Sequence, residues 1–80
     1  MEDILNDRER IGKRIAQLRK QHNMSQVQLA EKSGVGFSHI ARIELGKYSV
    51  GIDTLQKIAN VFELTVDFVS QNYYENKQPQ

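Results

Sequence analysis

In this 80-residue sequence, the number and placement of the Lys and Arg residues give the clearest indication of a binding chemistry. The formal net charge of the chain is only +1, but residues 8–51 hold nine Lys or Arg and three Glu, and both ends are acidic. A basic body between acidic ends can gather positive potential on one face, which suits a negatively charged partner. Ordinary solvated helix charge is the alternative explanation.

Other site chemistries have little support in the sequence. There is no Cys, and His22 and His39 lie far apart, so neither a disulfide nor a metal site is expected. No Gly-rich phosphate loop, Ser-His-Asp pattern or close carboxylate pair in an evident pocket occurs, so we expect no enzyme, cofactor or small-molecule ligand. No signal peptide or membrane-spanning segment is recognised, which predicts a cytoplasmic protein.

Helical periodicity indicates the elements that must position the charges. Apolar residues at spacings of four and three predict a first helix over residues 8–22: Ile11, Ile15 and Leu18. Ser25 and Gln28 have the pattern of a capping box, which opens a second helix of about eight residues. Gly34 is placed to end this second helix in the left-handed conformation.

Three further helices are predicted downstream. The third spans residues 37–45 and ends at Gly46. The fourth carries an inward-facing stripe: Leu55, Ile58, Ala59 and Phe62. Thr65 is expected to cap a fifth helix that contains Val66, Phe68 and Val69. No segment alternates as a strand would, so we predict an all-α fold of five short helices over residues 8–72, with an acidic arm at 1–7 and a polar tail that frays at 73–80.

The third helix has two distinct sides. With about 100° of rotation per residue, Ile40 and Ile43 share one side. The opposite side is formed by three residues: Ser38, Arg42 and Leu45. Phe37 and His39 fall on the two flanks between these sides. An arginine in the middle of an outward side can bind the O6 and N7 atoms of guanine with two hydrogen bonds.

The second and third helices together have the spacing of a helix-turn-helix. Ala30 is small enough for the two helices to approach, and Gly34 permits the positive φ of a sharp corner. Three apolar residues would bury the inner side of the unit: Val35, Ile40 and Ile43. The second helix of such a unit can enter the major groove of DNA.

The sequence resembles the small helix-turn-helix regulators that include phage repressors, Cro proteins and the Xre family. The matching segments are IGKRIAQLRKQHNMSQVQLAEKSGV, HIARIELGK and TLQKIANVFEL, which lie within residues 9–69. The resemblance implies a compact five-helix, lambda-repressor-like domain that binds a double-stranded DNA operator and regulates transcription in bacteria. Gly36 and Val50-Gly51 depart from the family pattern, which predicts weaker caps on the third and fourth helices. Leu45 also departs from it, because the family usually has a polar residue there that contacts the DNA backbone.

The resemblance also implies roles for individual residues. Positions that read base edges in the family correspond to Phe37, Ser38 and Arg42. Gln26 matches a position whose side chain and backbone amide hold a phosphate, and Lys47 matches a position that contacts the DNA backbone. Arg19 and Glu44 match a pair that forms a buried salt bridge, which would give Glu44 a structural role.

Simpler explanations stay open for several of these side chains. Phe37 could contact a thymine methyl group or pack over the second helix and brace the turn. Ser38 could support the start of its helix, and Arg42 could be a solvated charge. His39 is expected to be half-buried on its flank, with a phosphate contact as the alternative. Tyr48 could reach the DNA backbone or be an ordinary surface residue.

A single domain of this kind covers about 600–1,000 Å² on DNA, which is too little for a specific site. We therefore predict a homodimer on a near-palindromic operator, with half-sites about one helical turn apart. The candidate interface is apolar: Val66, Val69 and Tyr73. The alternative is that Phe68 and Val69 close the monomer core. A second class of function, a protein-interaction module or an antitoxin on the same fold, is suggested by Phe37 and Leu45.

Overall fold

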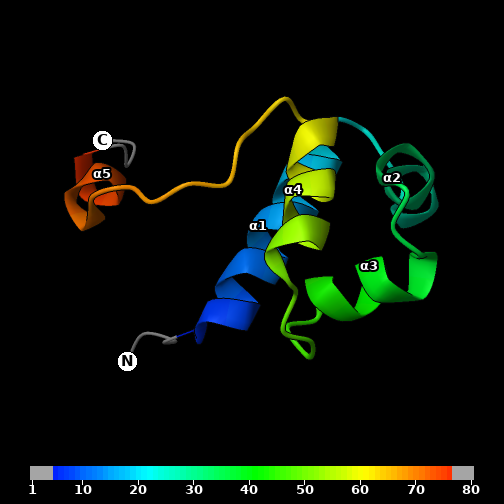
Figure 1. Ribbon diagram of the computed structural model, residues 1–80, viewed down its shortest axis with the longest axis horizontal. Coiled ribbons are helices and arrows are strands. Elements are labelled where there is room, and N and C mark those ends of the chain that lie inside the picture. The colour runs from blue at the N-terminus through cyan, green and yellow to red at the C-terminus, as the bar shows by residue number, and fades with distance from the viewer. Residues whose placement is uncertain (1–4, 77–80) are drawn as a thin grey trace.

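Five α-helices make up the described part of the computed structural model, which comprises residues 5–76, with side chains described up to residue 73. The helices are α1 (Asp7–Gln21), α2 (Gln26–Ser33), α3 (Phe37–Glu44), α4 (Ile52–Val61) and α5 (Gln71–Asn76). Between residues 5 and 76 no strand forms, which confirms the all-α prediction. None of these helices is long and apolar enough to cross a membrane. Figure 1 shows α1 to α4 gathered together and α5 set apart from them.

Side-chain caps fix the starts of the first two helices. Ser25 Oγ accepts a hydrogen bond from the Gln28 N–H at 3.0 Å, and Gln28 Oε1 accepts one from the Ser25 N–H at 2.7 Å, which confirms the predicted capping box. Asn6 and Glu9 form a second such box at the start of α1. By contrast, α3 and α4 begin after Gly36 and Gly51 without a side-chain cap, as the departures from the family pattern predict.

Left-handed residues end the first four helices. Gly34 ends α2 with a φ of 78°, as predicted, and Gly46 follows α3 with a φ of 75°. Asn23 after α1 and Glu63 after α4 have the same conformation without being glycines, with φ values of 56° and 59°. A left-handed conformation is unfavourable for a residue with a Cβ, so the turn at Glu63 carries backbone strain.

The core lies between α1, α2, α3 and α4. Its buried apolar side chains come from these helices, from the loop residue Val35 and from Phe62, which directly follows α4: Ile15, Leu29, Val35, Ile40, Ile43, Ile58 and Phe62. Helix α3 packs against both α1 and α2, and α2 also packs against α4. Gly12 allows α1 to approach α3 closely, because a Cβ there would overlap the Ile43 carbonyl oxygen.

The prediction for the fifth helix is wrong in its position. Thr65 caps no helix, residues 65–70 form no regular element, and α5 begins only at Gln71. The Asp67 side chain accepts a hydrogen bond from the Phe68 N–H at 2.7 Å, a local bond that competes with helix formation. Gln56 of α4 also holds this segment, since its Oε1 accepts from the Val66 N–H at 2.9 Å.

The shifted helix changes two further expectations. Phe68 is 100% exposed and Val69 is 53% exposed, so these side chains do not close the monomer core. Residues 73–76, which were placed in a fraying polar tail, have helical backbone in α5. The rest of the expected tail, residues 77–80, and most of the expected acidic arm, residues 1–4, lie outside the described residues.

Candidate nucleic-acid interface

The turn between α2 and α3 fixes how α3 is presented. Ser33 Oγ accepts a hydrogen bond from the Val35 N–H at 3.2 Å, and it donates to the Ala30 carbonyl at 3.4 Å. Val35 is buried directly after the left-handed Gly34. These contacts turn the chain sharply, and α3 then runs along the edge of the four-helix group (Figure 1).

One side of α3 is buried and the opposite side is exposed. Ile40 and Ile43 are buried, which confirms the inward side expected from the helical rotation. The outward side is exposed along its length: Ser38, Arg42 and Leu45. Phe37, at the first position of α3, is 50% exposed. The exposed side of α3 therefore combines one guanidinium group, one hydroxyl group and two apolar side chains.

An aromatic ring lies against two of the polar side chains of α3. The rings of His39 and Tyr48 are stacked, with centroids 5.1 Å apart and an interplanar angle of 27°. The Arg42 guanidinium carbon lies 5.8 Å from the centroid of the same Tyr48 ring. His39 is exposed on its flank of α3, and its ring leans onto Tyr48.

The turn at the end of α3 fixes the backbone position of Lys47. The Gly46 N–H donates to the Ile43 carbonyl at 3.0 Å, and the Lys47 N–H donates to the Arg42 carbonyl at 3.2 Å. This pair of bonds is the Schellman arrangement that a left-handed residue produces at a helix end. Lys47 is exposed, and its backbone position relative to Arg42 is set by the second of these bonds.

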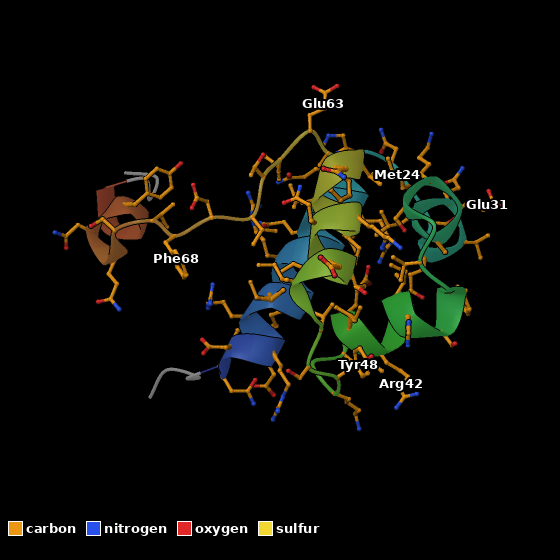
Figure 2. All side chains as sticks on the ribbon, in the orientation of Figure 1. Met24, Glu31, Arg42, Tyr48, Glu63 and Phe68 are labelled. Atoms are coloured by element: carbon orange, nitrogen blue, oxygen red, sulfur yellow. The ribbon has the colours of Figure 1, made fainter. Side chains whose placement is uncertain are left out.

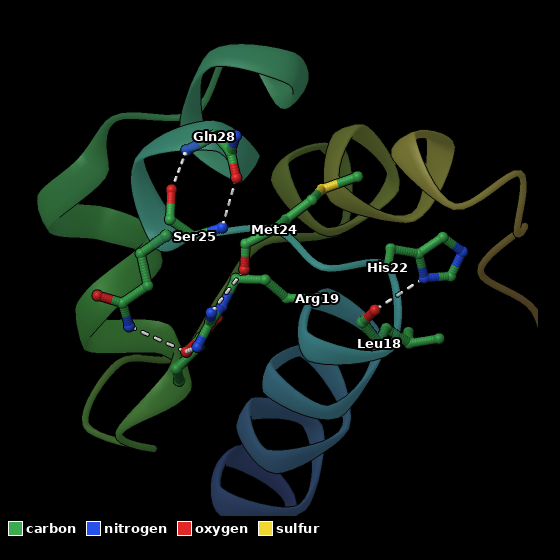
Figure 3. Close-up of polar contacts among 8 residues, drawn as sticks. Leu18, Arg19, His22, Met24, Ser25 and Gln28 are labelled. Atoms are coloured by element: carbon green, nitrogen blue, oxygen red, sulfur yellow. Dashed lines mark hydrogen bonds and ion pairs between the residues drawn. The ribbon is translucent and has the colours of Figure 1, made fainter.

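Arg19 of α1 forms an ion pair with Glu44, the last residue of α3, as the family resemblance implied (Figure 3). Arg19 Nε donates to Glu44 Oε2 at 2.8 Å, and Arg19 Nη2 donates to Glu44 Oε1 at 3.0 Å. The two side chains are only 12% and 6% exposed. The hydrogen bond to Glu44 raises the pKa of Arg19 above its ordinary value, against the opposing effect of burial.

Gln26 belongs to the same network. Its Nε2 donates to Glu44 Oε1 at 2.9 Å, and Arg19 Nη1 donates to the Met24 carbonyl at 2.9 Å (Figure 3). The Gln26 side chain is therefore engaged within the protein, an arrangement that the sequence did not predict. As the first residue of α2, Gln26 has a backbone N–H that helix geometry leaves without a partner in its own helix.

Among the described residues, no group of three His, Asp or Glu side chains is arranged to hold a metal ion.

Tyr48 is a second residue, besides Gln26, whose contacts the sequence did not reveal, because a helical rotation places residues within a helix and not in the loop after it. The sequence did hold one signal for these contacts, namely an aromatic residue that follows shortly after the glycine at the end of a helix.

Comparisons with known proteins agree with this geometry. The family model HTH_3, described as helix-turn-helix, matches residues 15–69. The immunity repressor protein of Bacillus phage phi105 is 36% identical over 59 residues, which are 74% of this chain and 41% of the phage protein. The HTH-type transcriptional regulator PuuR of Escherichia coli (strain K12) is 40% identical over 68 residues, which are 85% of this chain and 35% of PuuR.

A solved structure supports the same assignment. The crystal structure of an HTH_3 family transcriptional regulator from Vibrio cholerae matches with a TM-score of 0.69 and 33% sequence identity, over 72% of this chain and 33% of that chain. The chain thus spans less than half the length of each of these proteins. The family model, in contrast, matches well over half of the chain. This chain belongs to the helix-turn-helix family of which these regulators are members.

Proposed function

We propose that this chain is a sequence-specific, double-stranded DNA-binding regulator of transcription that inserts α3 into the major groove. The observation that carries the proposal is the exposed outward side of a firmly packed α3, on which Arg42 lies between Ser38 and Leu45. The excess of Lys and Arg within residues 8–51 supplies positive potential, which attracts the phosphates of DNA. Relatives named as a repressor and as transcriptional regulators support the same function.

The residues divide by the part of DNA that they would contact. Base edges would be contacted by the outward side and the exposed flank of α3: Phe37, Ser38 and Arg42. Phosphates would be contacted by Lys47, by His39 and by the backbone N–H of Gln26, since a helix N-terminus favours an anion. The Gln26 side chain would hold Glu44 in place, because its amide already donates to that carboxylate. Arg19 and Glu44 would orient α3 without touching DNA.

Binding tests of Arg42 separate base reading from general charge attraction. The bound site is first selected from random double-stranded DNA, and its affinity is then measured at several salt concentrations, where a steep fall with salt is expected. Arg42→Ala is expected to lose about 1–3 kcal/mol of specific affinity. Arg14→Ala is the matched control, because it removes the same charge from an exposed position on α1. Equal losses in both variants would contradict base reading by Arg42.

We further propose that the chain acts as a homodimer through its C-terminal segment. The candidate interface comprises Val66, Val69 and Tyr73, together with Phe68 beside them. Phe68 is fully exposed and Val69 and Tyr73 are about half exposed, which leaves apolar surface available to a second copy. A two-fold dimer would read a near-palindromic operator with half-sites about one helical turn apart.

Analytical ultracentrifugation of two charge-introducing variants tests the dimer. Phe68→Asp is expected to shift the chain toward monomer, and it leaves the monomer fold intact because the ring is fully exposed. Ile52→Asp is the control, since Ile52 is also exposed but lies at the start of α4. Dissociation by Ile52→Asp alone would place the interface elsewhere. A wild-type chain that stays monomeric on its selected DNA would contradict the dimer.

A protein-interaction module, with an antitoxin as its mixed form, is the second candidate function. Two exposed apolar side chains at the ends of α3 favour it, since Phe37 is 50% exposed and Leu45 is 65% exposed. The selection experiment also separates the two functions. Recovery of a defined site supports the regulator, whereas failure to recover any DNA would support protein binding through α3.

A further inference from the structure

Tyr48 connects the loop after α3 to two side chains of α3 itself. Its ring stacks on the His39 ring at 5.1 Å, and the Arg42 guanidinium carbon lies 5.8 Å from its centroid. His39 and Arg42 are three residues apart in the helix, so one ring can reach both. Figure 2 shows Tyr48 and Arg42 on the same edge of the molecule, beside α3. The three side chains form what we call the Tyr48 cluster: His39, Arg42 and Tyr48.

Unlike its two partners, Tyr48 is held by the core. It is partly buried and packs against the core cluster, whereas His39 and Arg42 are exposed. It shares a shallow hollow with Ile43 and Leu55, which belong to α3 and α4. A ring that is fixed on one side by packing and contacted on the other by exposed polar groups can limit the conformations of those groups.

We propose that Tyr48 is a positioning residue that orders Arg42 and His39 before DNA arrives; this inference rests on the proposed DNA-binding function. An exposed arginine samples many rotamers, and immobilising such a side chain on binding weakens association. A cation over an aromatic face is attracted to it, so the ring restricts the guanidinium in the free protein. The recorded contacts involve the ring of Tyr48, so a phenylalanine at this position should serve equally well.

The first test uses the protein without DNA. Nuclear magnetic resonance relaxation of the Arg42 Nε–H group reports the motion of the guanidinium on the relevant timescale. Tyr48→Leu, which keeps apolar packing, is expected to increase this motion, and Tyr48→Phe is expected to leave it as in the wild type. The Nε–H of Arg14, on α1, is the internal control. Equal Arg42 motion in the wild type and in Tyr48→Leu would overturn the proposal.

The second test measures binding to the site selected by the wild type. Tyr48→Leu is expected to weaken specific binding by about 2- to 10-fold, the effect of one freed side chain. The salt dependence of binding should not change, because no phosphate contact is lost. Tyr48→Phe should restore wild-type affinity, and thermal unfolding of each variant checks that it is folded.

The same substitution in a second background identifies the cause. In a chain that already carries His39→Ala and Arg42→Ala, Tyr48→Leu is expected to have no further effect, because nothing remains to be positioned. A loss that persists in this background, or a loss with Tyr48→Phe, would show that Tyr48 contacts DNA itself and would overturn the proposal. Failure of the wild type to bind any DNA would overturn the proposed function instead.

Discussion

Removal of the Glu44 carboxylate should destabilise the domain more than any surface substitution. Glu44 accepts three hydrogen bonds, two from Arg19 and one from Gln26. With Glu44→Ala, the Arg19 guanidinium keeps the Met24 carbonyl as its recorded acceptor while remaining largely enclosed. A largely enclosed cation that loses its counter-charge is costly, because the protein has already removed most of its solvation.

The expected loss is a large fraction of the total stability. Breaking a buried ion pair by removing one partner costs about 3–5 kcal/mol. At about 0.05–0.15 kcal/mol per residue, a chain of this length has roughly 4–12 kcal/mol to lose. Each kcal/mol shifts the midpoint by about 4–8 °C in a domain of this size, so Tm should fall by about 12 °C or more.

Urea unfolding followed by circular dichroism measures the loss, and a double variant tests its cause. Arg19→Met with Glu44→Leu leaves no buried charge, so this chain should be more stable than Glu44→Ala alone. Sodium chloride should change the difference little, because the pair is shielded from solvent. A loss of less than about 1 kcal/mol for Glu44→Ala, or a double variant less stable than it, would refute the reasoning.

Three further substitutions test other parts of the structure. Gly12→Ala should cost about 1–3 kcal/mol in thermal unfolding, because its Cβ would meet the Ile43 carbonyl and separate α1 from α3; an unchanged Tm would contradict this close packing. Glu63→Gly should stabilise the chain by about 0.5–1 kcal/mol by relieving a φ of 59°; a lower urea midpoint would contradict that strain. Phe37→Ala should abolish discrimination between thymine-bearing and uracil-substituted sites at unchanged Tm, whereas lost stability with retained discrimination would mean that the ring braces the turn.

Local signals were enough to predict the first four helices. The capping box of Ser25 and Gln28, and the left-handed Gly34, are decided within a few residues of chain, so their sequence pattern carries over directly into structure. The buried side of α3 could be predicted from helical rotation, because the rotation places Ile40 and Ile43 on the same side of the helix. Predictions of this kind depend on contacts between near neighbours.

The segment after α4 shows where such reasoning stops. Thr65 with Val66 and Val69 has the pattern of a capped, amphipathic turn, yet the segment is not helical. One competing bond comes from Gln56, ten residues earlier, and the other from the Asp67 side chain to its neighbour. Because the two alternatives differ by a few hydrogen bonds, periodicity alone could not rank them.

The same limit applies to the candidate site. The family resemblance placed Arg19 opposite Glu44, but it assigned the Gln26 side chain to a phosphate and left Tyr48 undecided. Gln26 meets Glu44 across eighteen residues of sequence, and Tyr48 meets α3 only because the left-handed Gly46 turns the chain back. Both contacts depend on tertiary geometry that no short window of sequence contains.

These contacts anchor the two ends of α3 differently. Its last residue, Glu44, is bound by Arg19 and Gln26, and the Gly46 turn and the Tyr48 ring hold the adjoining surface. Its first residue follows Gly36, which provides no side-chain cap. In the proposed complex, Arg42 therefore lies on the pre-ordered half of α3 and Phe37 on the half with fewer restraints. Since pre-ordered groups lose less entropy on binding, base discrimination should be strongest at the position that faces Arg42.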